Sequence, residues 1–398
     1  MSSQDFIYKY QSASELKLSS LRRGEVFFAD ITELNDGHEG KPALVLSGRL
    51  EVYERFFEWL SSRLIIPKVA ANKSTVQMLY DISLRLASHV KRESKGRDIH
   101  IDEIADLLNL ALIKISNDVD VSNGVRRLLL QAPDFLRHEV QDYVGKSFST
   151  ASFSRTSLNP TMWGHYGDAD KGFVTCYQVN GNSMPAEFSE HCFTECRNKK
   201  IILEGIEREV TELGLSTKGS IELQQVSYSN RRPKVNLAHL FSNQFLFSEA
   251  EQHYDYDAHF CGSVAQKQFE KFLLFKSPDW RYEKEVRLVH SGAKLPEHRL
   301  GVLGGLDSII LGFNTNNVTS ERIIESMKQF VKSGDSLAPK SVTIFRAVPN
   351  STSYKYNLKL EGEILMLEGR CVFARLKELD GTSIKKLKSK MEIIKNSK

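Results

Sequence analysis

The spacing of apolar residues changes twice along this chain, and that change most restricts the fold. Residues 51–64, 74–92, 102–115 and 124–144 carry apolar side chains at helical spacing, whereas the flanking segments alternate as strands do. No Gly-, Ser- or Pro-rich linker borders this helical stretch. The sequence therefore predicts an α+β protein, with a mixed or antiparallel sheet core and residues 51–145 inserted as a helical subdomain.

Strand patterns occupy both flanks of the insertion. Before it, we expect strands at 6–10 and 25–29, with a helix between them that opens at a Ser12–Glu15 capping box and ends at Gly24. After it, the sequence predicts strands at 148–154, 172–179, 221–228, 283–289 and 308–311, helices near 262–276 and 320–332, and two or three strands within 342–375. The expected division is a discontinuous core of 1–50 and 146–348, then C-terminal strands and a basic amphipathic helix in 349–398.

Length and charge restrict the class of protein. A chain of 398 residues exceeds the roughly 250 at which single cores stop growing, and 41% hydrophobic residues exclude a mostly disordered protein. The net charge is +4, but residues 385–398 alone contribute +5 through six Lys and one Glu. Contact with nucleic acid is therefore expected, if anywhere, through this lysine-rich tail.

The expected location is the cytoplasm. No apolar run approaches the roughly 18–20 residues of a membrane-spanning helix, so no membrane partner is expected. The N-terminal residues lack the pattern of a secretory signal, and five cysteines suit a reducing compartment.

The first candidate segment is Tyr8-Lys9-Tyr10 in the first predicted strand. Lys9 points opposite to the two tyrosines, and a buried lysine requires a partner. It is suited to hold a pyrophosphate or a carboxylate, while the alternative is an edge strand that leaves Lys9 in water.

The second candidate segment runs from Ser152 to Gly172. Trp163, His165 and Tyr166 offer ring faces for a nucleobase and a titratable imidazole, while Ser152 and Ser154 share a strand face from which they can bind a ribose or a phosphate. The alternative is a packed aromatic corner.

The third candidate segment is Glu283-Lys284-Glu285-Val286-Arg287. In a strand, the two glutamates and Arg287 share one face, where Arg287 can offset the repulsion between the carboxylates. Such a pair can grip a sugar hydroxyl and stabilise the cation that forms when a glycosidic bond breaks. The alternative is a solvated ladder of ion pairs.

Metal-binding patterns are weak. His191, Cys192 and Cys196, with His259 and Cys261, contain the right residue types for zinc but not a standard spacing, so no metal is expected. No P-loop, dinucleotide-binding glycine pattern or nucleophile elbow is present.

Taken in order, these segments resemble the bacterial domain-of-unknown-function 2971 family. The matching pieces are Tyr8-Lys9-Tyr10, Leu21-x-x-Gly24, Phe27-Phe28, Asn35-Asp36, Ser152-Phe153-Ser154, Met162-Trp163-x-His165-Tyr166, Lys171-Gly172 and Trp280-x-Tyr282-Glu283-Lys284-Glu285-x-Arg287. Gly37-His38 stands where the family usually has Pro-Phe. The resemblance covers about 1–50 and 146–315.

A more distant resemblance is to ADP-ribosyltransferases, which carry a basic or His residue on the first strand, a Ser-x-Ser strand midway and a late Glu-x-Glu. Lys9, Ser152/Ser154 and Glu283/Glu285 follow that order, although Lys9 replaces the expected Arg or His and about 130 residues separate Ser from Glu. The resemblance implies NAD as substrate, with a macromolecular acceptor, in a bacterial defence or toxin system. It assigns Glu285, Glu283 and His165 to catalysis, and NAD binding to Lys9, Tyr10, Ser152, Ser154, Trp163, Tyr166 and Arg287.

Two other functions fit the sequence. One is a non-catalytic sensor that binds protein or nucleic acid through its insertion and basic tail. The other is a metal-dependent nuclease that uses Asp168, Asp170 and Glu283.

Overall fold

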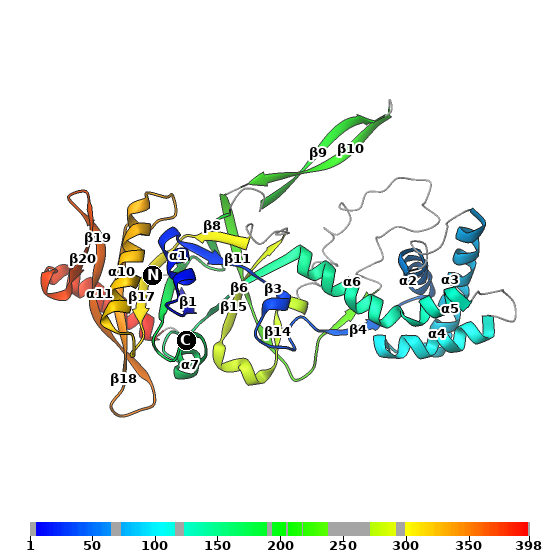
Figure 1. Ribbon diagram of the computed structural model, residues 1–398, viewed down its shortest axis with the longest axis horizontal. Helices are drawn as coiled ribbons and strands as arrows, with labels where there is room; N and C mark the ends of the chain where they lie inside the picture. The colour runs from blue at the N-terminus through cyan, green and yellow to red at the C-terminus, as the bar shows by residue number, and fades with distance from the viewer. Residues whose placement is uncertain are drawn as a thin grey trace. The chain divides into compact units, whose positions relative to one another are not determined.

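The computed structural model describes residues 5–64, 73–115, 123–188, 193–203, 206–216, 218–237, 271–291 and 299–396. Contacts divide the chain into two compact units (Figure 1). The first comprises Met1–Asn35, Lys146–Ser229 and Lys276–Lys398, and the second comprises Asp36–Gly145 and Asn230–Phe275. The second unit takes in residues 36–50 and 230–275, which the sequence analysis grouped with the core.

The first unit is built on a 13-stranded sheet. Its order is β2-β16-β8-β11-β15-β6-β1-β7-β17-β18-β19-β20, and β3 pairs with β6. The strands are β1 (Asp5–Gln11), β2 (Glu25–Phe27), β3 (Ala29–Asp30), β6 (Phe148–Ser154), β7 (Phe173–Val179), β8 (Ser183–Phe188), β11 (Lys218–Gln225), β15 (Glu285–Ser291), β16 (Leu300–Leu303), β17 (Leu306–Leu311), β18 (Ser341–Pro349), β19 (Tyr356–Leu367) and β20 (Arg370–Arg375).

Most of this sheet is antiparallel. The described pairings are antiparallel except that of β17 with β18. Helix α10 (Asn317–Ser333) connects those two strands, because parallel neighbours need a crossover. Outside this sheet, β9 (Phe193–Leu203) pairs with β10 (Ile206–Ser216), and β12 (Ser227–Tyr228) pairs with β14 (Phe275–Lys276).

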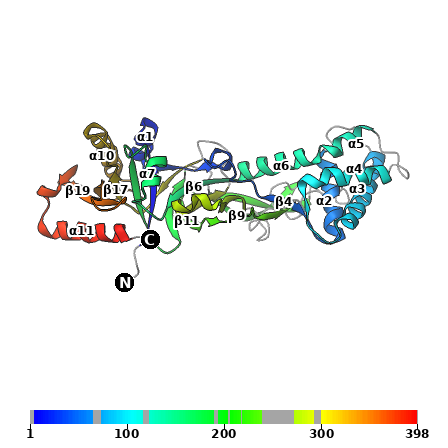
Figure 2. The ribbon, with the colours of Figure 1, turned by 90° about the horizontal axis from the view of Figure 1, so that it is seen from below.

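Helices cover both faces of the sheet. On one face, α1 (Glu15–Arg23) and α10 pack apolar side chains such as Leu18 and Phe330 against residues that include Ile7 and Phe153. On the other, α7 (Pro160–Tyr166) and α11 (Gly381–Asn396) contribute residues that include Trp163 to a second apolar cluster. Figure 2 shows α1 and α10 on one side of β17 and β19, and α11 on the other. Because successive side chains along each strand point to opposite faces of the sheet, the strands contribute apolar residues to two separate cores.

The second unit is mainly helical. Among its described residues, the helices are α2 (Leu50–Leu64), α3 (Lys73–Ser94), α4 (Ile101–Ile115), α5 (Asn123–Leu130) and α6 (Ala132–Ser147), the last of which ends directly before β6. Its core combines aliphatic side chains such as Leu79 and Leu108 with an aromatic group in which Trp59 packs against Phe56 and Phe135. A small sheet of β4 (Ala43–Leu46), β5 (Ile99–His100) and β13 (Lys234–Asn236) accompanies the helices.

The α+β class with a largely antiparallel sheet is confirmed. The break between α5 and α6 falls just before Pro133, which begins a helix well but cannot continue one. One local prediction is wrong, because Ser14 rather than Ser12 precedes α1. Of the predicted helix near 262–276, residues up to 270 lie outside the described residues.

We predict that Gly24→Ala destabilises the protein by about 2–4 kcal/mol. Gly24 ends α1 with φ +67°, and a Cβ there would clash with the Phe330 ring of α10. Urea unfolding measures the change. The matched control is Gly381→Ala, at a glycine with no atom within 4 Å of the added Cβ. It should stay within about 0.5 kcal/mol of the wild type, and equal losses from both variants would contradict the Gly24 assignment.

Candidate active site

The three candidate segments lie on three adjacent strands of the large sheet. β15 pairs with β6, and β6 pairs with β1. Ser154 is opposite Tyr8 on one side and Glu285 on the other, so these three residues share one face of the sheet. By the same register, Ser152 lies opposite Arg287 on that face.

Four buried charged residues form the centre of this face, and we call them the charge cluster: Lys276, Glu283, Glu285 and Arg287. Each is at most 7% exposed. The Lys276 ammonium donates to Glu283 Oε2 at 2.7 Å and to Glu285 Oε2 at 3.3 Å. Arg287 donates from Nε to Glu285 Oε1 at 2.7 Å and from Nη2 to Oε2 at 3.0 Å. Two cations therefore face two carboxylates.

The electrostatics keep Glu285 ionised. Burial by itself raises the pKa of a carboxyl group. Here the charge and hydrogen bonds of Arg287, the charge of Lys276 and a hydrogen bond from Ser152 outweigh it and lower the pKa of Glu285 to about 2. The carboxylate thus carries its negative charge at neutral pH.

Glu283 does not lie on the strand with Glu285, contrary to the predicted strand at 283–289. It ends a short 3-10 helix, η4 (Pro278–Glu283), and Lys284 follows in the left-handed region with φ 45°. Strand β15 begins only at Glu285. The two carboxylates still meet, because the turn at Lys284 leaves both within reach of Lys276.

The two serines contact this turn differently. The Ser152 hydroxyl contacts the Glu285 side chain, whereas the Ser154 hydroxyl donates to the backbone carbonyl of Glu283 at 2.6 Å. The Glu285 amide donates to the Tyr228 hydroxyl at 2.8 Å. Neighbouring strands therefore fix both the backbone and the side chain at the acidic positions.

Aromatic rings surround the charge cluster. The Tyr166 hydroxyl donates to Glu283 Oε1 at 2.6 Å. Burial, together with that hydrogen bond, raises the pKa of Tyr166. The Trp280 ring covers the Lys276 ammonium at 4.6 Å and lies 6.1 Å from the Tyr282 ring. His165 is exposed, with its ring 6.2 Å from those of Tyr166 and Tyr282. Partly exposed rings therefore lie beside buried charges.

Tyr10 and Trp163 belong to the apolar core of this face. Trp163 is fully buried, donates from its indole to the Ser157 carbonyl at 3.0 Å, and packs edge-on against Tyr10. The Tyr10 hydroxyl donates to the Thr156 carbonyl at 2.9 Å. Neither ring is open to a ligand in this arrangement.

Lys9 is not brought together with Glu283 and Glu285. It follows Tyr8 on β1, so its side chain extends from the opposite face of the sheet, where its ammonium lies over the Phe153 ring. The ammonium donates to the backbone carbonyl of Ser152 at 3.1 Å. Lys9, which the ADP-ribosyltransferase resemblance groups with the acidic pair, therefore lies apart from it, whereas Tyr166 contacts Glu283.

The acidic residues of the nuclease hypothesis have other partners. Asp170 accepts from the Tyr356 hydroxyl at 2.8 Å, and Glu283 belongs to the charge cluster. Asp168 is exposed in a left-handed turn. Within the described ranges, no three His, Cys, Asp or Glu side chains gather as a metal site. Of the zinc candidates, His191, Cys192, His259 and Cys261 lie outside the described residues, as does the Cys196 side chain.

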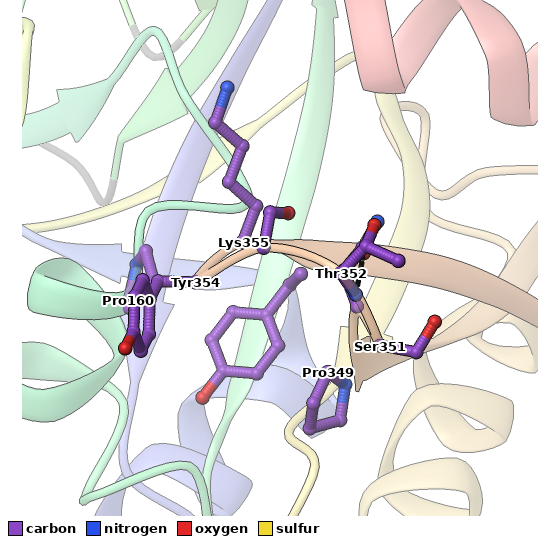
Figure 3. Close-up of a pocket in the computed structure, with 9 residues that line it drawn as sticks. Pro160, Pro349, Ser351, Thr352, Tyr354 and Lys355 are labelled. Carbon is purple, nitrogen blue, oxygen red and sulfur yellow. Dashed lines mark hydrogen bonds between the residues drawn. The ribbon is translucent and has the colours of Figure 1, made fainter.

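A cavity of about 630 Å³ lies at the turn between β18 and β19 (Figure 3). Its lining comes from the turn residues 349–356 and from Pro160 at the start of α7. Tyr356 connects this lining to α7, because its ring packs against Trp163. None of the four charge-cluster residues lines the cavity.

Lys276 was missed by the sequence analysis. The signal that identifies it is the one used for Lys9, a lysine that follows apolar residues and must find a partner when buried. Here Phe272 to Phe275 precede it. Its partners are seven and nine residues away, a spacing that no single helix or strand brings together.

We predict that Glu285→Gln destabilises the protein at neutral pH by about 3 kcal/mol, because it leaves Arg287 buried with less charge compensation. The matched control is Glu25→Gln, which breaks an ion pair with the exposed Arg23 and should cost less than about 1 kcal/mol. Urea unfolding measures both, and equal effects would contradict a structural role for the charge cluster.

The loss should also depend on pH. The folded-state pKa of Glu285, about 2, lies below that of an unfolded glutamate. Its contribution is therefore complete above the unfolded pKa of about 4.3 and disappears as the pH falls toward the folded value. The difference between wild type and Glu285→Gln should shrink over that interval, and a constant difference would contradict the assignment.

No described helix is both long and apolar enough to cross a membrane. No curated protein and no solved structure matches the chain, and no comparison supports the ADP-ribosyltransferase likeness. The family model described as "Protein of unknown function (DUF2971)" matches residues 162–288, which confirms the family resemblance over the segment that holds the charge cluster.

Proposed function

We propose that this face of the sheet binds NAD and transfers ADP-ribose from it to an acceptor. The observation that carries the proposal is the adjacency of β1, β6 and β15, with Ser154 in register with Glu285 and the Ser152 hydroxyl bonded to the Glu285 carboxylate. Segments about 130 residues apart thus supply a carboxylate and two hydroxyls to one place.

The chemistry follows from a fixed negative charge. Cleavage of the bond between nicotinamide and ribose develops positive charge on the sugar, and an ionised carboxylate beside the anomeric carbon stabilises it. Glu285 is ionised and held by Arg287. The hydrogen bond from Lys276 to Glu285, at 3.3 Å, is longer than the one from Lys276 to Glu283, at 2.7 Å. A ribose hydroxyl can therefore take the place of Lys276 at Glu285 while Lys276 stays bonded to Glu283.

The rings of Tyr166, Trp280 and Tyr282 are the candidates for stacking on nicotinamide or adenine, because each keeps part of its surface exposed. In this proposal Glu283, bonded to Tyr166, activates the acceptor. Tyr10 and Trp163 have a structural role in this proposal, because both lie in the apolar core on the same face of the sheet.

We predict that the protein releases nicotinamide from NAD, measured by chromatography with candidate acceptor proteins present. Glu285→Gln should lower the rate at least about 100-fold, as expected for loss of charge stabilisation. The matched control is Glu222→Gln, an exposed glutamate on the neighbouring strand β11, which should leave the rate unchanged.

Because Glu285→Gln also weakens the fold, Ser152→Ala provides a second variant that keeps both carboxylates. It should lower the rate while retaining cooperative unfolding. Absence of nicotinamide release from the wild type, or a full rate in a folded Glu285→Gln protein, would overturn the proposal.

A second candidate is a non-catalytic module that binds nucleic acid. The charge cluster favours a non-catalytic role, because its carboxylates are buried and are bonded to Lys276 and Arg287 instead of facing a substrate. It is also favoured by α11, which anchors Leu387 and Ile394 in the core and leaves Lys385, Lys386 and Lys388 exposed.

For this module we predict salt-dependent binding to single- or double-stranded nucleic acid, measured by fluorescence anisotropy. Replacing Lys385, Lys386 and Lys388 by Gln should make the slope of log affinity against log salt shallower by about 2–3. Replacing the exposed Lys332 and Lys340 is the control and should leave the slope unchanged. Equal slopes in all three proteins would exclude α11 as the contact.

A further inference from the structure

The cavity at the turn between β18 and β19 has the dimensions of a small-molecule site (Figure 3). Its volume of about 630 Å³ lies within the range of about 300–1,000 Å³ that is typical of such sites. Two segments distant in the sequence form the lining, Pro160 at the start of α7 and residues 349–356 of the turn. Aromatic and apolar side chains with a few polar groups line most ligand sites, and this lining has that composition.

Hydrogen bonds within the turn hold its shape. The Asn350 amide donates to the Lys355 carbonyl at 2.9 Å, which closes the loop between them. The side-chain oxygen of Asn350 accepts from the Thr352 amide at 2.8 Å and from the Thr352 hydroxyl at 2.9 Å. Because these bonds are present without a ligand, binding has little backbone ordering to oppose it.

Four other side chains of the turn are available to a ligand. Among the described residues, no hydrogen bond or ion pair engages the side chains of Ser351, Ser353, Tyr354 and Lys355. The Tyr354 side chain is fully exposed. In the view of Figure 3, Tyr354 projects on the side of Pro160, whereas Ser351 projects on the opposite side of the turn. The cavity therefore offers an aromatic surface, hydroxyl groups and an ammonium group.

Tyr356 contributes its ring to the lining, because its hydroxyl already donates to Asp170 Oδ1 at 2.8 Å. The ring packs edge-on against Trp163, with the centroids 6.4 Å apart. Of the nine described residues that line the cavity, Lys355 is the one cation and none is acidic. This lining suits a ligand with a flat ring and an anionic group.

We propose that the cavity binds a nucleoside phosphate. The base stacks on the Tyr354 ring, the sugar lies among the serine hydroxyls of the turn, and the phosphate is held by Lys355. Every nucleobase has a flat face that stacks on an aromatic ring, so this contact does not require a particular base. Lys355 distinguishes this ligand from a neutral sugar or an uncharged peptide, because neither gains from a nearby cation.

This chemistry has two sources, a free nucleotide and the adenosine phosphate half of NAD. Helix α7 begins at Pro160 in the cavity lining and ends at Tyr166, whose hydroxyl contacts Glu283. A helix of seven residues is about 10 Å long. The NAD source rests on the function proposed above, whereas a free nucleotide does not.

The test measures binding of adenosine monophosphate to the full chain by ligand-observed NMR titration. The dissociation constant should be below about 1 mM. Adenosine, which lacks the phosphate, and ribose 5-phosphate, which lacks the base, should both bind more weakly. A photoreactive probe, 8-azidoadenosine monophosphate, locates the site, and peptide mass spectrometry should find the label within residues 349–356.

Variants at exposed positions separate the contacts. Tyr354→Ala should weaken binding at least about fivefold, whereas Tyr354→Phe keeps the ring and should stay within about twofold of the wild type. Lys355→Gln should lower the preference for adenosine monophosphate over adenosine by at least about twofold. The matched controls are Leu367→Ala, at the other end of β19, and Lys340→Gln, directly before β18. Both side chains are exposed and outside the lining, so binding should not change.

Equal binding of the three ligands, an unchanged affinity in Tyr354→Ala, or a label confined to other parts of the chain would overturn the proposal. NAD then distinguishes the two sources. Binding of NAD at least about tenfold tighter than adenosine monophosphate would assign the adenosine half of NAD to the cavity, and binding no tighter would assign a free nucleotide. These measurements do not depend on nicotinamide release, so failure of this proposal is distinguishable from failure of the NAD proposal.

Discussion

The contact of one ammonium with two carboxylates organises the centre of the large sheet. Lys276 reaches Glu283 at 2.7 Å and Glu285 at 3.3 Å in a setting where all three side chains are buried. An isolated charge there would cost several kcal/mol, so each of these groups requires the others. This mutual dependence holds η4 against β15, and with it the rings of Trp280 and Tyr166 around the charge cluster.

Strand alternation gives the same sheet two chemically different faces. Glu285 and Ser154 project to one side with Tyr8, whereas Lys9 projects to the other beside Phe153. The first face holds balanced charges beside aromatic rings, whereas on the second the Lys9 ammonium lies over the Phe153 ring and donates to a backbone carbonyl.

The segment that matches the DUF2971 family model includes all of the charge cluster, together with Tyr166 and Tyr228. Lys9, Ser152 and Ser154 lie before it in the sequence and reach the site through the pairing of β1 and β6 with β15. The charge cluster is thus built within the matched segment, while the hydroxyls that contact it come from a strand outside.

The sequence by itself determined the α+β class, the helical character of 51–145 and strands such as 148–154, because apolar spacing is set locally by the geometry of helices and strands. It also identified Glu285, Arg287, Ser152 and Ser154 as candidate site residues. Only the tertiary structure decided that Lys276 joins both carboxylates, that Lys284 bends Glu283 off the strand, and that Lys9 faces away from them. Those outcomes depend on strand register between distant segments and on the left-handed backbone conformation of Lys284, and the spacing of apolar residues along the chain does not encode either.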